Sequence, residues 1–590
     1  MSAIAELSPE VIAEQYDATV RADIEAFRGQ SQDYMAGRLT DDEFRGFRLR
    51  RGIYGQRQAG VHMVRTKVPG GILTARQMNQ LARIADEFGS GRGHLTTRQN
   101  VQYHFVPLPD VPALLHLLAD VRLTTREACY NTVRNVTACP TAGLLRDEVF
   151  NVNPYAQRVA FAFLHRELTD SMPRKFKIAL CGCSKDCMVG AIHDAGLKAE
   201  IRDGKRGFRM VVGGGLGPLP NEAALLDEFV PEERIINKLE AVLRVFNKYG
   251  NRKNKNKARL KFVLRERGFE WLRDEVEKEY QDVLVNGGIP APTSVPEGFG
   301  GFEENPQPVG SGSLLPIVDE RRASDLDFDA WLETNVTEQR QTGYSLVTVR
   351  VDQGNLTGDQ MRGLAKISTD AGDGLLRFTI DQNVLLGFIP VANLRRVHAA
   401  LKPLGLSDAG AKEIDDITTC PGAWTCNLGL TKSMTLGAAL SETVKSYRDP
   451  LVRKLQIKIS GCPNSCGQHW ISDFGFYGNA RKIGGREVPY YLMMLGGGYD
   501  EGGMIKFGLA INSLPARLAP VAVQRVLDHF VANRNPGESF RNYVMRHKVE
   551  SFKAMTSDLA KPAELFPEMY KDWGDDNDFS LQLGRGECAS

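Results

Sequence analysis

The hydrophobic and polar positions along this chain follow two periods, one helical and one strand-like, which alternate. The first fifty residues are polar with a helical pattern, and Asp41 and Asp42 precede the segment EFRGFRLRRG as the cap of an amphipathic helix. After them, strand-like runs alternate with helical runs such as residues 78–88 and 361–369. The pattern predicts a mixed α and β protein that opens with a helical segment.

A Pro- and Gly-rich stretch at 286–313 has little periodicity and divides the chain near its middle. Short motifs recur in the same order on both sides of it, and Gln99 corresponds to Gln382, 283 residues later. The matched segments are ILTARQM (72–78) with NLTGDQM (355–361), TRQNV (97–101) with IDQNV (380–384), and KFKIALCGCSKDC (175–187) with KLQIKISGCPNSC (454–466). Chance does not produce such a collinear series. The sequence therefore predicts an internally duplicated, pseudo-twofold α+β protein whose central cleft could hold a large cofactor.

Composition narrows the class of protein. Of the 590 residues, 42% are apolar and 25% are charged, and the formal net charge is +2, which argues against a dedicated nucleic-acid binder. No apolar run is long enough to span a membrane, and the first twenty residues lack the features of a secretory signal. Ten cysteines are too few for a disulfide scaffold, so we expect a reducing compartment, the cytoplasm.

Four cysteines of the second half form two close pairs. Five residues separate Cys420 from Cys426, and three separate Cys462 from Cys466. Two thiolate pairs suit a zinc ion or an iron–sulfur cluster, but the wider spacing fits structural zinc poorly. Glycine and proline beside these cysteines allow backbone N–H groups to approach the sulfurs and tune a cluster. The pattern favours a [4Fe–4S] cluster over a zinc ion or buried structural thiols.

The paired cysteines resemble the signature of the sirohaem-dependent sulfite and nitrite reductases. The duplication, the segment PRKFK at 173–177 and the segment TTRQNVQYH at 96–104 support this resemblance, which extends from about Phe47 to past Gly498. It implies ferredoxin-like half domains combined with two sirohaem- and Fe–S-binding α+β domains. The segments expected are an N-terminal helical segment (1–50), a ferredoxin-like half domain (51–130), a sirohaem- and substrate-binding domain (131–285), a Pro/Gly-rich linker (286–330), a second ferredoxin-like half domain (331–405), and a [4Fe–4S]- and sirohaem-binding domain with the C-terminal tail (406–590).

The resemblance also implies two cofactors, a sirohaem and a [4Fe–4S] cluster. The cluster ligands would be Cys420, Cys426, Cys462 and Cys466. Cys466 would in addition be the axial ligand of the sirohaem iron, so that one thiolate couples the two groups electronically.

The first half has a related but incomplete set of cysteines. It keeps Cys139, Cys183 and Cys187, but Leu145 stands where the fourth ligand is expected. We interpret the three as remnants of the duplication. Because Cys181 lies close by in the sequence, a second cluster remains an alternative.

Reduction of an oxyanion needs a site that neutralises negative charge and supplies protons, and Arg and Lys do both. By resemblance, the substrate site consists of Arg65, Arg134, Lys175 and Lys177. Lys175 and Lys177 flank Phe176, so on a strand both face one side. Their mutual repulsion should lower their pKa values and make them better proton donors.

Sirohaem carries many carboxylates, so its groove must be basic. Thr96, Arg98 and Arg259 match sirohaem-binding positions of the family, and Asn464, between the last two cysteines, is expected to contact the macrocycle. His94 stands where some relatives carry Arg and would bind a carboxylate only when protonated.

One covalent modification is compatible with the sequence. Some relatives link a Tyr and a Cys near the sirohaem, in segments similar to those that contain Tyr54 and Cys129. The spacing here permits such a link, and an unlinked pair is an equal alternative.

Lys177 favours sulfite as the substrate. The second Lys of the K-x-K pair is typical of sulfite reductases, whereas nitrite reductases tend to have Asn there. Sulfite is larger and mostly doubly charged near neutral pH, so it benefits from a further cation. The sequence therefore resembles most an assimilatory, ferredoxin-type sulfite reductase that reduces sulfite to sulfide with six electrons. The alternative is a ferredoxin-dependent nitrite reductase that forms ammonia.

The electron donor is expected to be a separate protein, because the sequence shows no flavin- or NADPH-binding module. A ferredoxin or a flavoprotein subunit would serve.

Two other classes of protein share part of the pattern. A non-catalytic Fe–S or sirohaem electron carrier would keep the four cysteines but need not keep the four substrate-site cations together. A zinc-stabilised RNA-binding protein would use the basic run from Arg252 to Lys261. The near-zero net charge and the lack of an aromatic-rich RNA-binding strand disfavour it.

Overall fold

The computed structural model describes residues 9–289, 292, 295–296, 306–310, 312–313, 315–316, 325–582, 584 and 587. Part of the predicted linker at 286–330 therefore lies outside the described residues. The described part packs on the second half of the chain, where the Val309 N–H donates to the Gly372 carbonyl (2.9 Å) and Leu315 is buried. Helix α10 (Leu326–Asn335) already begins within the predicted linker.

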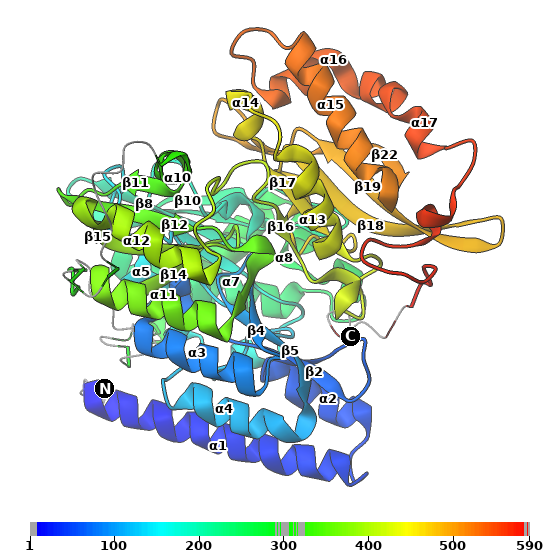
Figure 1. The fold of residues 1–590 in the computed structure, drawn as a ribbon. Coiled ribbons are helices and arrows are strands. Elements are labelled where there is room, and N and C mark those ends of the chain that lie inside the picture. Colours follow the sequence, from blue (N-terminus) through cyan, green and yellow to red (C-terminus); the bar gives the residue numbers. More distant parts are fainter. Residues whose placement is uncertain are drawn as a thin grey trace.

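Two helices open the described chain, α1 (Pro9–Met35) and α2 (Asp41–Arg50). The cap of α2 is Thr40: its hydroxyl accepts the Glu43 N–H, and the Glu43 carboxylate accepts the Thr40 N–H at 2.8 Å. Asp41 and Asp42 occupy the first turn instead, where their charges favour the helix dipole. Helix α1 lies along α4 (Val111–Ala119) and forms the outermost layer of this end of the molecule (Figure 1).

Two five-stranded sheets lie next, with the orders β1-β2-β5-β4-β13 and β11-β12-β15-β14-β3. Each sheet takes four strands from one repeat and one from the other. Strand β3 (Ile72–Thr74) pairs antiparallel with β14 (Leu375–Phe378), and β13 (Asn355–Thr357) pairs antiparallel with β4 (Arg92–Leu95). The remaining strands are β1 (Ile53–Gly55), β2 (Val61–Arg65), β5 (Val101–Pro107), β11 (Val336–Glu338), β12 (Tyr344–Val349) and β15 (Val384–Pro390). The two half domains thus exchange strands across the pseudo-twofold axis.

The matched motifs ILTARQM and NLTGDQM are an exchanged strand followed by the start of a helix. Thr74 caps α3 (Ala75–Glu87) and Thr357 caps α11 (Gly358–Ala371), each in a capping box with the Gln three residues later. Helices α3 and α11 pack against each other, and the next helices are α4 in the first repeat and α12 (Leu394–Leu401) in the second (Figure 1). The repeat therefore encodes the same strand–cap–helix unit twice.

Gln99 and Gln382 make two equivalent hydrogen bonds each, one of them to the other repeat. The Gln99 side chain donates to the carbonyls of Ala138 (2.9 Å) and Phe378 (2.8 Å) and accepts the Ala138 N–H (3.0 Å). The Gln382 side chain donates to the Leu95 carbonyl (2.7 Å) and accepts the Thr419 N–H (2.8 Å). Both glutamines are buried, so these amides satisfy backbone groups that water does not reach.

Replacing Gln99 with methionine should lower the free energy of unfolding by about 2–4 kcal/mol, because it leaves buried backbone groups without a partner. The midpoint of urea unfolding measures this loss. Gln281→Met on the exposed face of α9 (Phe269–Val285) is the control and should shift the midpoint little. Equal midpoints for the two variants would contradict this role of Gln99.

The other two large sheets are also copies of each other, with the orders β10-β9-β8-β7-β6 and β16-β17-β18-β19-β22. In each sheet, taken in chain order, the first two pairings between strands are parallel and the next two are antiparallel. The strands are β6 (Thr137–Ala138), β7 (Ile178–Cys181), β8 (Ala195–Arg202), β9 (Lys205–Val212), β10 (Ala224–Pro231), β16 (Thr418–Thr419), β17 (Ile457–Ser460), β18 (Phe474–Ile483), β19 (Arg486–Leu495) and β22 (Leu509–Pro515). A small ribbon of β20 (Gly498–Tyr499) and β21 (Ile505–Lys506) lies beside the second of these sheets.

Helices cover these sheets. They are α5 (Asn153–Ala162), α6 (Glu167–Asp170), α7 (Ile235–Tyr249), α8 (Leu260–Arg267) and α9 in the first repeat, and α13 (Ser433–Val444), α14 (Pro450–Arg453), α15 (Ala519–Asn533), α16 (Phe540–Met555) and α17 (Ser557–Ala560) in the second. One hydrophobic core runs through both ferredoxin-like halves and the first larger domain, and a separate core fills the second larger domain. The predicted fold class, a duplicated α+β protein with ferredoxin-like half domains, is confirmed.

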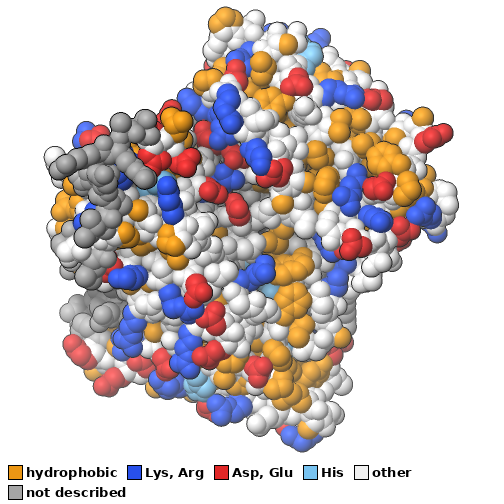
Figure 2. Space-filling model, in the orientation of Figure 1, with side chains coloured by type: hydrophobic (Ala, Val, Ile, Leu, Met, Phe, Trp, Pro, Cys, Tyr) orange, Lys and Arg blue, Asp and Glu red, His pale blue; other side chains and the backbone are white. Residues whose placement is uncertain are grey.

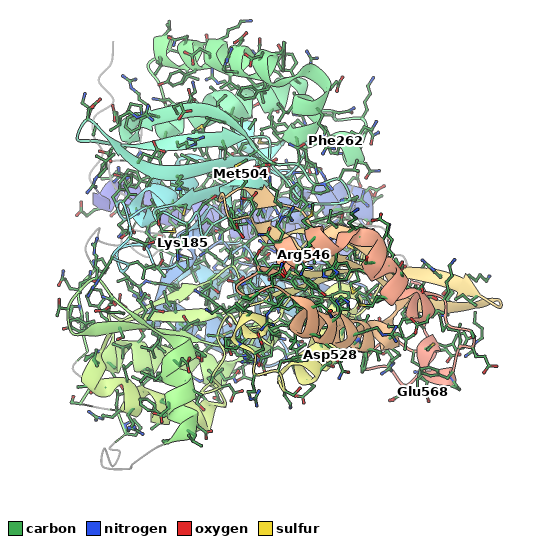
Figure 3. The ribbon with its side chains drawn as sticks, turned by 90° about the horizontal axis from the view of Figure 1, so that it is seen from above. Lys185, Phe262, Met504, Asp528, Arg546 and Glu568 are labelled. Carbon is green, nitrogen blue, oxygen red and sulfur yellow. The ribbon has the colours of Figure 1, made fainter. Side chains whose placement is uncertain are left out.

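The surface agrees with the balanced charge of the sequence. On the face shown in Figure 2, basic and acidic side chains are interspersed rather than gathered into a patch of one sign. The hairpin of β18 and β19 extends beyond the body of the molecule in both views (Figure 1 and Figure 3). Among the described residues, no helix combines the length and the apolar character that crossing a membrane requires.

Candidate functional site

The paired cysteines of the second half lie where two neighbouring strands end. Cys420 directly follows β16, and Cys462 follows β17 after Gly461. Because β16 and β17 are parallel, their carboxyl ends meet at the same edge of the sheet. The Gly461 N–H donates to the Cys420 sulfur (3.3 Å), which is the N–H···S contact that the neighbouring glycine predicts.

Three of these four thiols, Cys420, Cys426 and Cys466, line one cavity. Cys462 is buried and close enough to the other three to interact with them electrostatically. The pKa of the Cys462 thiol is raised well above its usual value by burial and then by the neighbouring Cys466, Cys420 and Cys426. No three of these sulfurs form a group within 4.8 Å, so they leave more room than one metal ion fills. The set suits a cluster of several irons.

The predicted substrate cations come together in a hollow that adjoins the cysteine cavity. Arg65 comes from β2, Arg134 precedes β6, and Lys175 and Lys177 precede β7. The side chains that line this hollow include Arg65, Arg134, Lys175, Lys177, Thr96, Arg98 and Cys466. Phe176 between the two lysines is fully buried, so both lysines face the hollow as alternation predicts.

Neighbouring cations of the hollow lie close enough to lower the pKa values of Lys177 and Arg98. The pKa of Lys177 lies well below its usual value because of burial and because Arg98, Arg259 and Lys175 are nearby. Burial, followed by Arg134, lowers the pKa of Arg98 to about 9. The Nε and Nη1 atoms of Arg98 are buried without a hydrogen-bond partner in the described protein. Buried, unpaired guanidinium N–H groups favour an anionic ligand, so these residues fit the carboxylates of sirohaem and a small oxyanion.

Arg259 lies near the hollow but is not one of the residues that line it. Its Nη2 donates to the Asp194 carboxylate (2.6 Å), and the same carboxylate oxygen accepts the Lys177 N–H (2.9 Å). Gly215 leaves room for this guanidinium, since a Cβ there would lie 2.8 Å from Arg259 Nη1. Asp194 therefore positions both Arg259 and Lys177.

Asp194 was not among the residues predicted from the sequence, but the repeat contains a signal for it. Its counterpart Asp473 accepts the N–H of Gln456, the counterpart of Lys177, at the same distance of 2.9 Å. An acidic residue that recurs at this position in both halves would have pointed to a shared structural role.

Two further residues were predicted near the sirohaem. Asn464 is exposed in the loop between Cys462 and Cys466, and its contact with the macrocycle stays a prediction. His94 lines the hollow; burial lowers its pKa to about 4, and its ring contacts the side chains of Asn355 and Gln382. This direction opposes the protonated form that binding of a carboxylate would need.

Tyr54 and Cys129 belong to one small buried cluster beside the hollow, together with Leu49 and Met63. The Tyr54 hydroxyl accepts from Arg134 Nη2 (3.4 Å), and Arg65 Nη1 lies 3.6 Å from the Cys129 sulfur. The pair thus supports the two substrate-site arginines. A covalent link between them stays a prediction.

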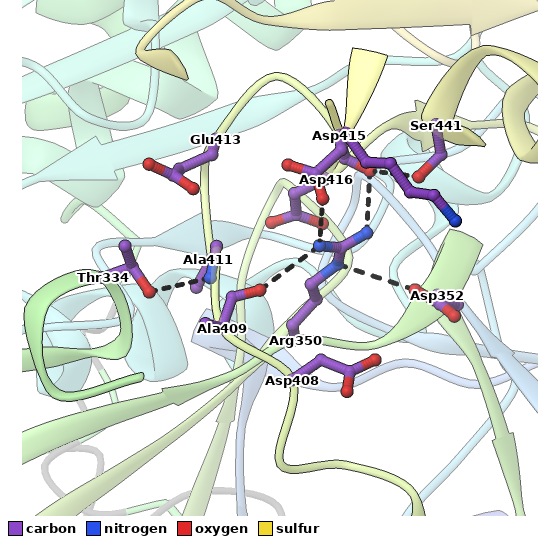
Figure 4. A network of polar contacts seen from close by, with 12 residues as sticks. Thr334, Arg350, Asp352, Asp408, Ala409, Ala411, Glu413, Asp415, Asp416 and Ser441 are labelled. Atoms are coloured by element: carbon purple, nitrogen blue, oxygen red, sulfur yellow. Dashed lines mark hydrogen bonds and ion pairs between the residues drawn. The ribbon is translucent and has the colours of Figure 1, made fainter. Parts of the chain in front are cut away.

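The pseudo-twofold counterpart of the hollow has lost most of its cations. Thr348 stands in place of Arg65, Asp381 in place of Arg98, Asp415 in place of Arg134 and Gln456 in place of Lys177. Asp415 accepts from Arg350 (2.7 Å), in the network shown in Figure 4. Asp415 also pairs with Arg453 (3.0 Å). The duplication therefore keeps one site that suits an oxyanion.

The duplicated α+β fold, with a group of thiols beside a basic hollow, suits a redox enzyme that acts on an anion. The family description "Nitrite and sulphite reductase 4Fe-4S domain" matches residues 129–284 and 410–563, and "Nitrite/Sulfite reductase ferredoxin-like half domain" matches residues 54–126 and 337–404. The chain belongs to the nitrite and sulfite reductase family. It is an oxidoreductase, and its family implies a sirohaem and a [4Fe–4S] cluster.

The relatives that resemble this chain include proteins named nitrite reductase and proteins named sulfite reductase. An assimilatory ferredoxin-dependent nitrite reductase of Haloferax mediterranei is 29% identical, over 90% of this chain and 89% of the relative. A ferredoxin–nitrite reductase of Synechococcus elongatus is 31% identical, over 79% and 86%. A sulfite reductase [ferredoxin] of Mycobacterium tuberculosis is 28% identical, over 84% of each. The solved structure of the Mycobacterium tuberculosis NirA protein superposes with a TM-score of 0.73 at 26% identity, covering 87% of this chain and 92% of that one.

Proposed function

We propose that this protein reduces sulfite to sulfide with six electrons that a ferredoxin supplies. The observation that carries the proposal is the cationic hollow, in which Lys177 adds a second lysine to Lys175, Arg65 and Arg134 beside Cys466. Sulfite reaches its dianionic form near neutral pH, so it gains more from this additional cation than the nitrite monoanion does. The names of the relatives, all ferredoxin-dependent, support the donor.

The cations divide into two roles. The guanidinium groups of Arg65 and Arg134 bind the oxyanion through paired N–H donors. Lys177, whose pKa is lowered by burial and by neighbouring cations, gives up a proton more readily than an exposed lysine and can protonate the departing oxygens. Asp194 keeps the Lys177 backbone in place. When bound, the sirohaem and the [4Fe–4S] cluster, held by the paired cysteines, supply the electrons.

Lys177→Asn should lower kcat/KM for sulfite by about 10–100-fold and change kcat/KM for nitrite much less, because the loss of one buried cation costs about 1.5–3 kcal/mol of anion stabilisation. Steady-state rates with a reduced viologen dye as donor measure both constants. Lys205→Asn at the exposed start of β9 is the matched control and should leave both unchanged. An unaltered ratio of the two constants in Lys177→Asn would refute the role of this lysine in substrate choice.

The second candidate function is the reduction of nitrite to ammonia. The two relatives named nitrite reductase, at 29% and 31% identity, favour it. The wild-type ratio of kcat/KM for sulfite to that for nitrite decides between the two. A preference for nitrite would overturn the sulfite proposal and leave the family and its cofactors unchanged. Turnover driven by reduced ferredoxin instead of the dye tests the donor separately.

A further inference from the structure

A second group of four cysteines lies in the first repeat, away from the basic hollow. Cys139 follows β6, Cys181 ends β7, and Cys183 and Cys187 lie in the loop after β7. Among the described residues, this is the one group of three or more metal-ligating side chains whose ligand atoms all lie within 4.8 Å of one another. Lys185, labelled in Figure 3, marks the loop.

The sulfurs are spaced for one metal ion. Their separations are 3.0 Å (Cys139–Cys187), 3.4 Å (Cys181–Cys183), 3.5 Å (Cys139–Cys181), 3.9 Å (Cys181–Cys187) and 4.0 Å (Cys139–Cys183). Four sulfurs at about 2.3 Å from a tetrahedral zinc ion lie about 3.8 Å from one another. All four cysteines are free thiols, and every separation exceeds a disulfide bond, which is about 2.05 Å.

The fourth ligand comes from a different place than in the second repeat, and this explains the tighter spacing. Leu145, the counterpart of Cys426, packs with Leu144, Leu346 and Phe388 instead of facing the cysteines. Cys181 replaces it from the end of β7, only two residues before Cys183. A ligand at the end of the strand brings the four sulfurs closer together than a ligand from the longer loop does.

The surroundings of the group suit thiolate ligands. Cys139, Cys181 and Cys183 are buried, at 1%, 2% and 6% exposure, so without a metal ion three polar thiols would face one another out of contact with water. The Gly182 N–H donates to the Cys139 sulfur (3.2 Å), as the Gly461 N–H does to Cys420 in the cluster site. Such N–H···S bonds stabilise negative charge on a ligand sulfur.

The space beside Cys187, the counterpart of Cys466, differs from the basic hollow. Cys187 lines a cavity of about 530 Å³ whose charged wall residues are Asp381, Asp473, Asp500, Glu501, Glu538, Lys454, Lys458 and Arg541. Acidic side chains outnumber basic ones there, whereas Arg and Lys line the basic hollow without Asp or Glu. This balance of charge suits a macrocycle with many carboxylates less well than the basic hollow does.

We propose that Cys139, Cys181, Cys183 and Cys187 bind a single tetrahedral zinc ion, separate from the [4Fe–4S] cluster. A closed set of four thiolates is typical of structural zinc. The ion holds the loop after β7, which contacts the second repeat where the Tyr499 hydroxyl donates to the Asp186 carbonyl (3.0 Å). Val189 of the same loop packs against Ile471 and Ile505 of the second repeat. The zinc thereby fixes part of the interface between the repeats.

The test is metal analysis of the purified holoenzyme together with X-ray absorption at the zinc edge. We expect about one zinc ion per chain, with four sulfur neighbours at about 2.3 Å. Cys181→Ser should lose the zinc and keep the iron and the sirohaem spectrum, whereas Cys462→Ser should lose iron and keep the zinc. Ser184→Ala, an exposed residue in the same loop, is the matched control and should keep both metals.

A structural effect should accompany loss of the zinc. Amide hydrogen exchange in residues 182–192 should speed up in Cys181→Ser and not in Ser184→Ala. A second set of four irons, a mononuclear iron, a disulfide within the group, or no metal in the wild-type protein would each overturn the proposal. The X-ray absorption spectrum of the wild-type protein tests the zinc site even if a variant fails to fold. Its result does not depend on which anion the enzyme reduces.

Discussion

Replacing Cys466 with serine should reduce kcat/KM for the anion substrate by at least about three orders of magnitude, because a hard hydroxyl is a poor substitute for the thiolate expected to serve both the cluster and the sirohaem iron. Cys466 and Cys420 are the two cysteines that line both the cysteine cavity and the basic hollow. The Thr97 hydroxyl donates to the Cys466 carbonyl at 2.9 Å. Activity with reduced viologen and the visible spectrum of the sirohaem measure the loss.

The comparison variant is Cys426→Ser. Cys426 lines the cysteine cavity but not the basic hollow, so its removal should weaken the cluster while the sirohaem absorption changes less. If Cys466→Ser and Cys426→Ser lost activity and altered the sirohaem spectrum to the same degree, Cys466 would have no special position between the two groups.

The second large effect concerns stability. Lys67→Met should lower the free energy of unfolding by about 3–5 kcal/mol, because it leaves the Glu127 carboxylate buried without its cation. The side chains of Lys67 and Glu127 are both at 0% exposure, with 3.4 Å between Lys67 Nζ and Glu127 Oε2. The second carboxylate oxygen accepts the His165 N–H (2.9 Å). Burial already raises the pKa of Glu127.

The double variant Lys67→Met/Glu127→Gln is the control. It removes the Glu127 negative charge together with the Lys67 cation, so it should recover most of the lost free energy of unfolding. The amide of Gln at position 127 can still accept the backbone N–H of His165. The pH dependence has a definite sign. The folded state binds a proton at Glu127 more tightly than the unfolded state does, because the pKa of Glu127 is raised on folding. The loss of unfolding free energy in Lys67→Met should therefore shrink as the pH falls and grow as the pH rises. Urea unfolding at neutral and mildly acidic pH measures both effects, and a deficit independent of pH would point to packing alone.

The sequence predicted features that local patterns or the repeat encode. The helices α3 and α11 and the cysteine pairs of the second half depend on residues a few positions apart, so their spacing identifies them, although the caps Thr74 and Thr357 were not predicted. The exchange of β3 and β13 could not be predicted, because a strand of three residues shows a preference for pairing but not the identity of its partner.

The same limit applied to the sites. Arg65, Arg134 and Lys177 come from separate segments, and their resemblance to a family suggested that they meet, which the basic hollow agrees with. Asp194 was missed because its effect depends on a contact with Arg259, 65 residues later. The interpretation of Cys139, Cys183 and Cys187 as remnants rested on the lack of a fourth ligand at Leu145, and Cys181 supplies that thiol from another position.

The exchanged strands have a consequence for the ancestry of the chain. A single repeat folded alone would lack the fifth strand of its ferredoxin-like sheet and expose the edge of β4 or β14. Two identical copies would each supply that strand to the other, as in a domain-swapped homodimer. Fusion of such a dimer into one chain would give the present topology. In the present chain the Arg and Lys residues that line the basic hollow come from the first half and the paired cysteines come from the second. Neither half alone therefore contains both parts of the site.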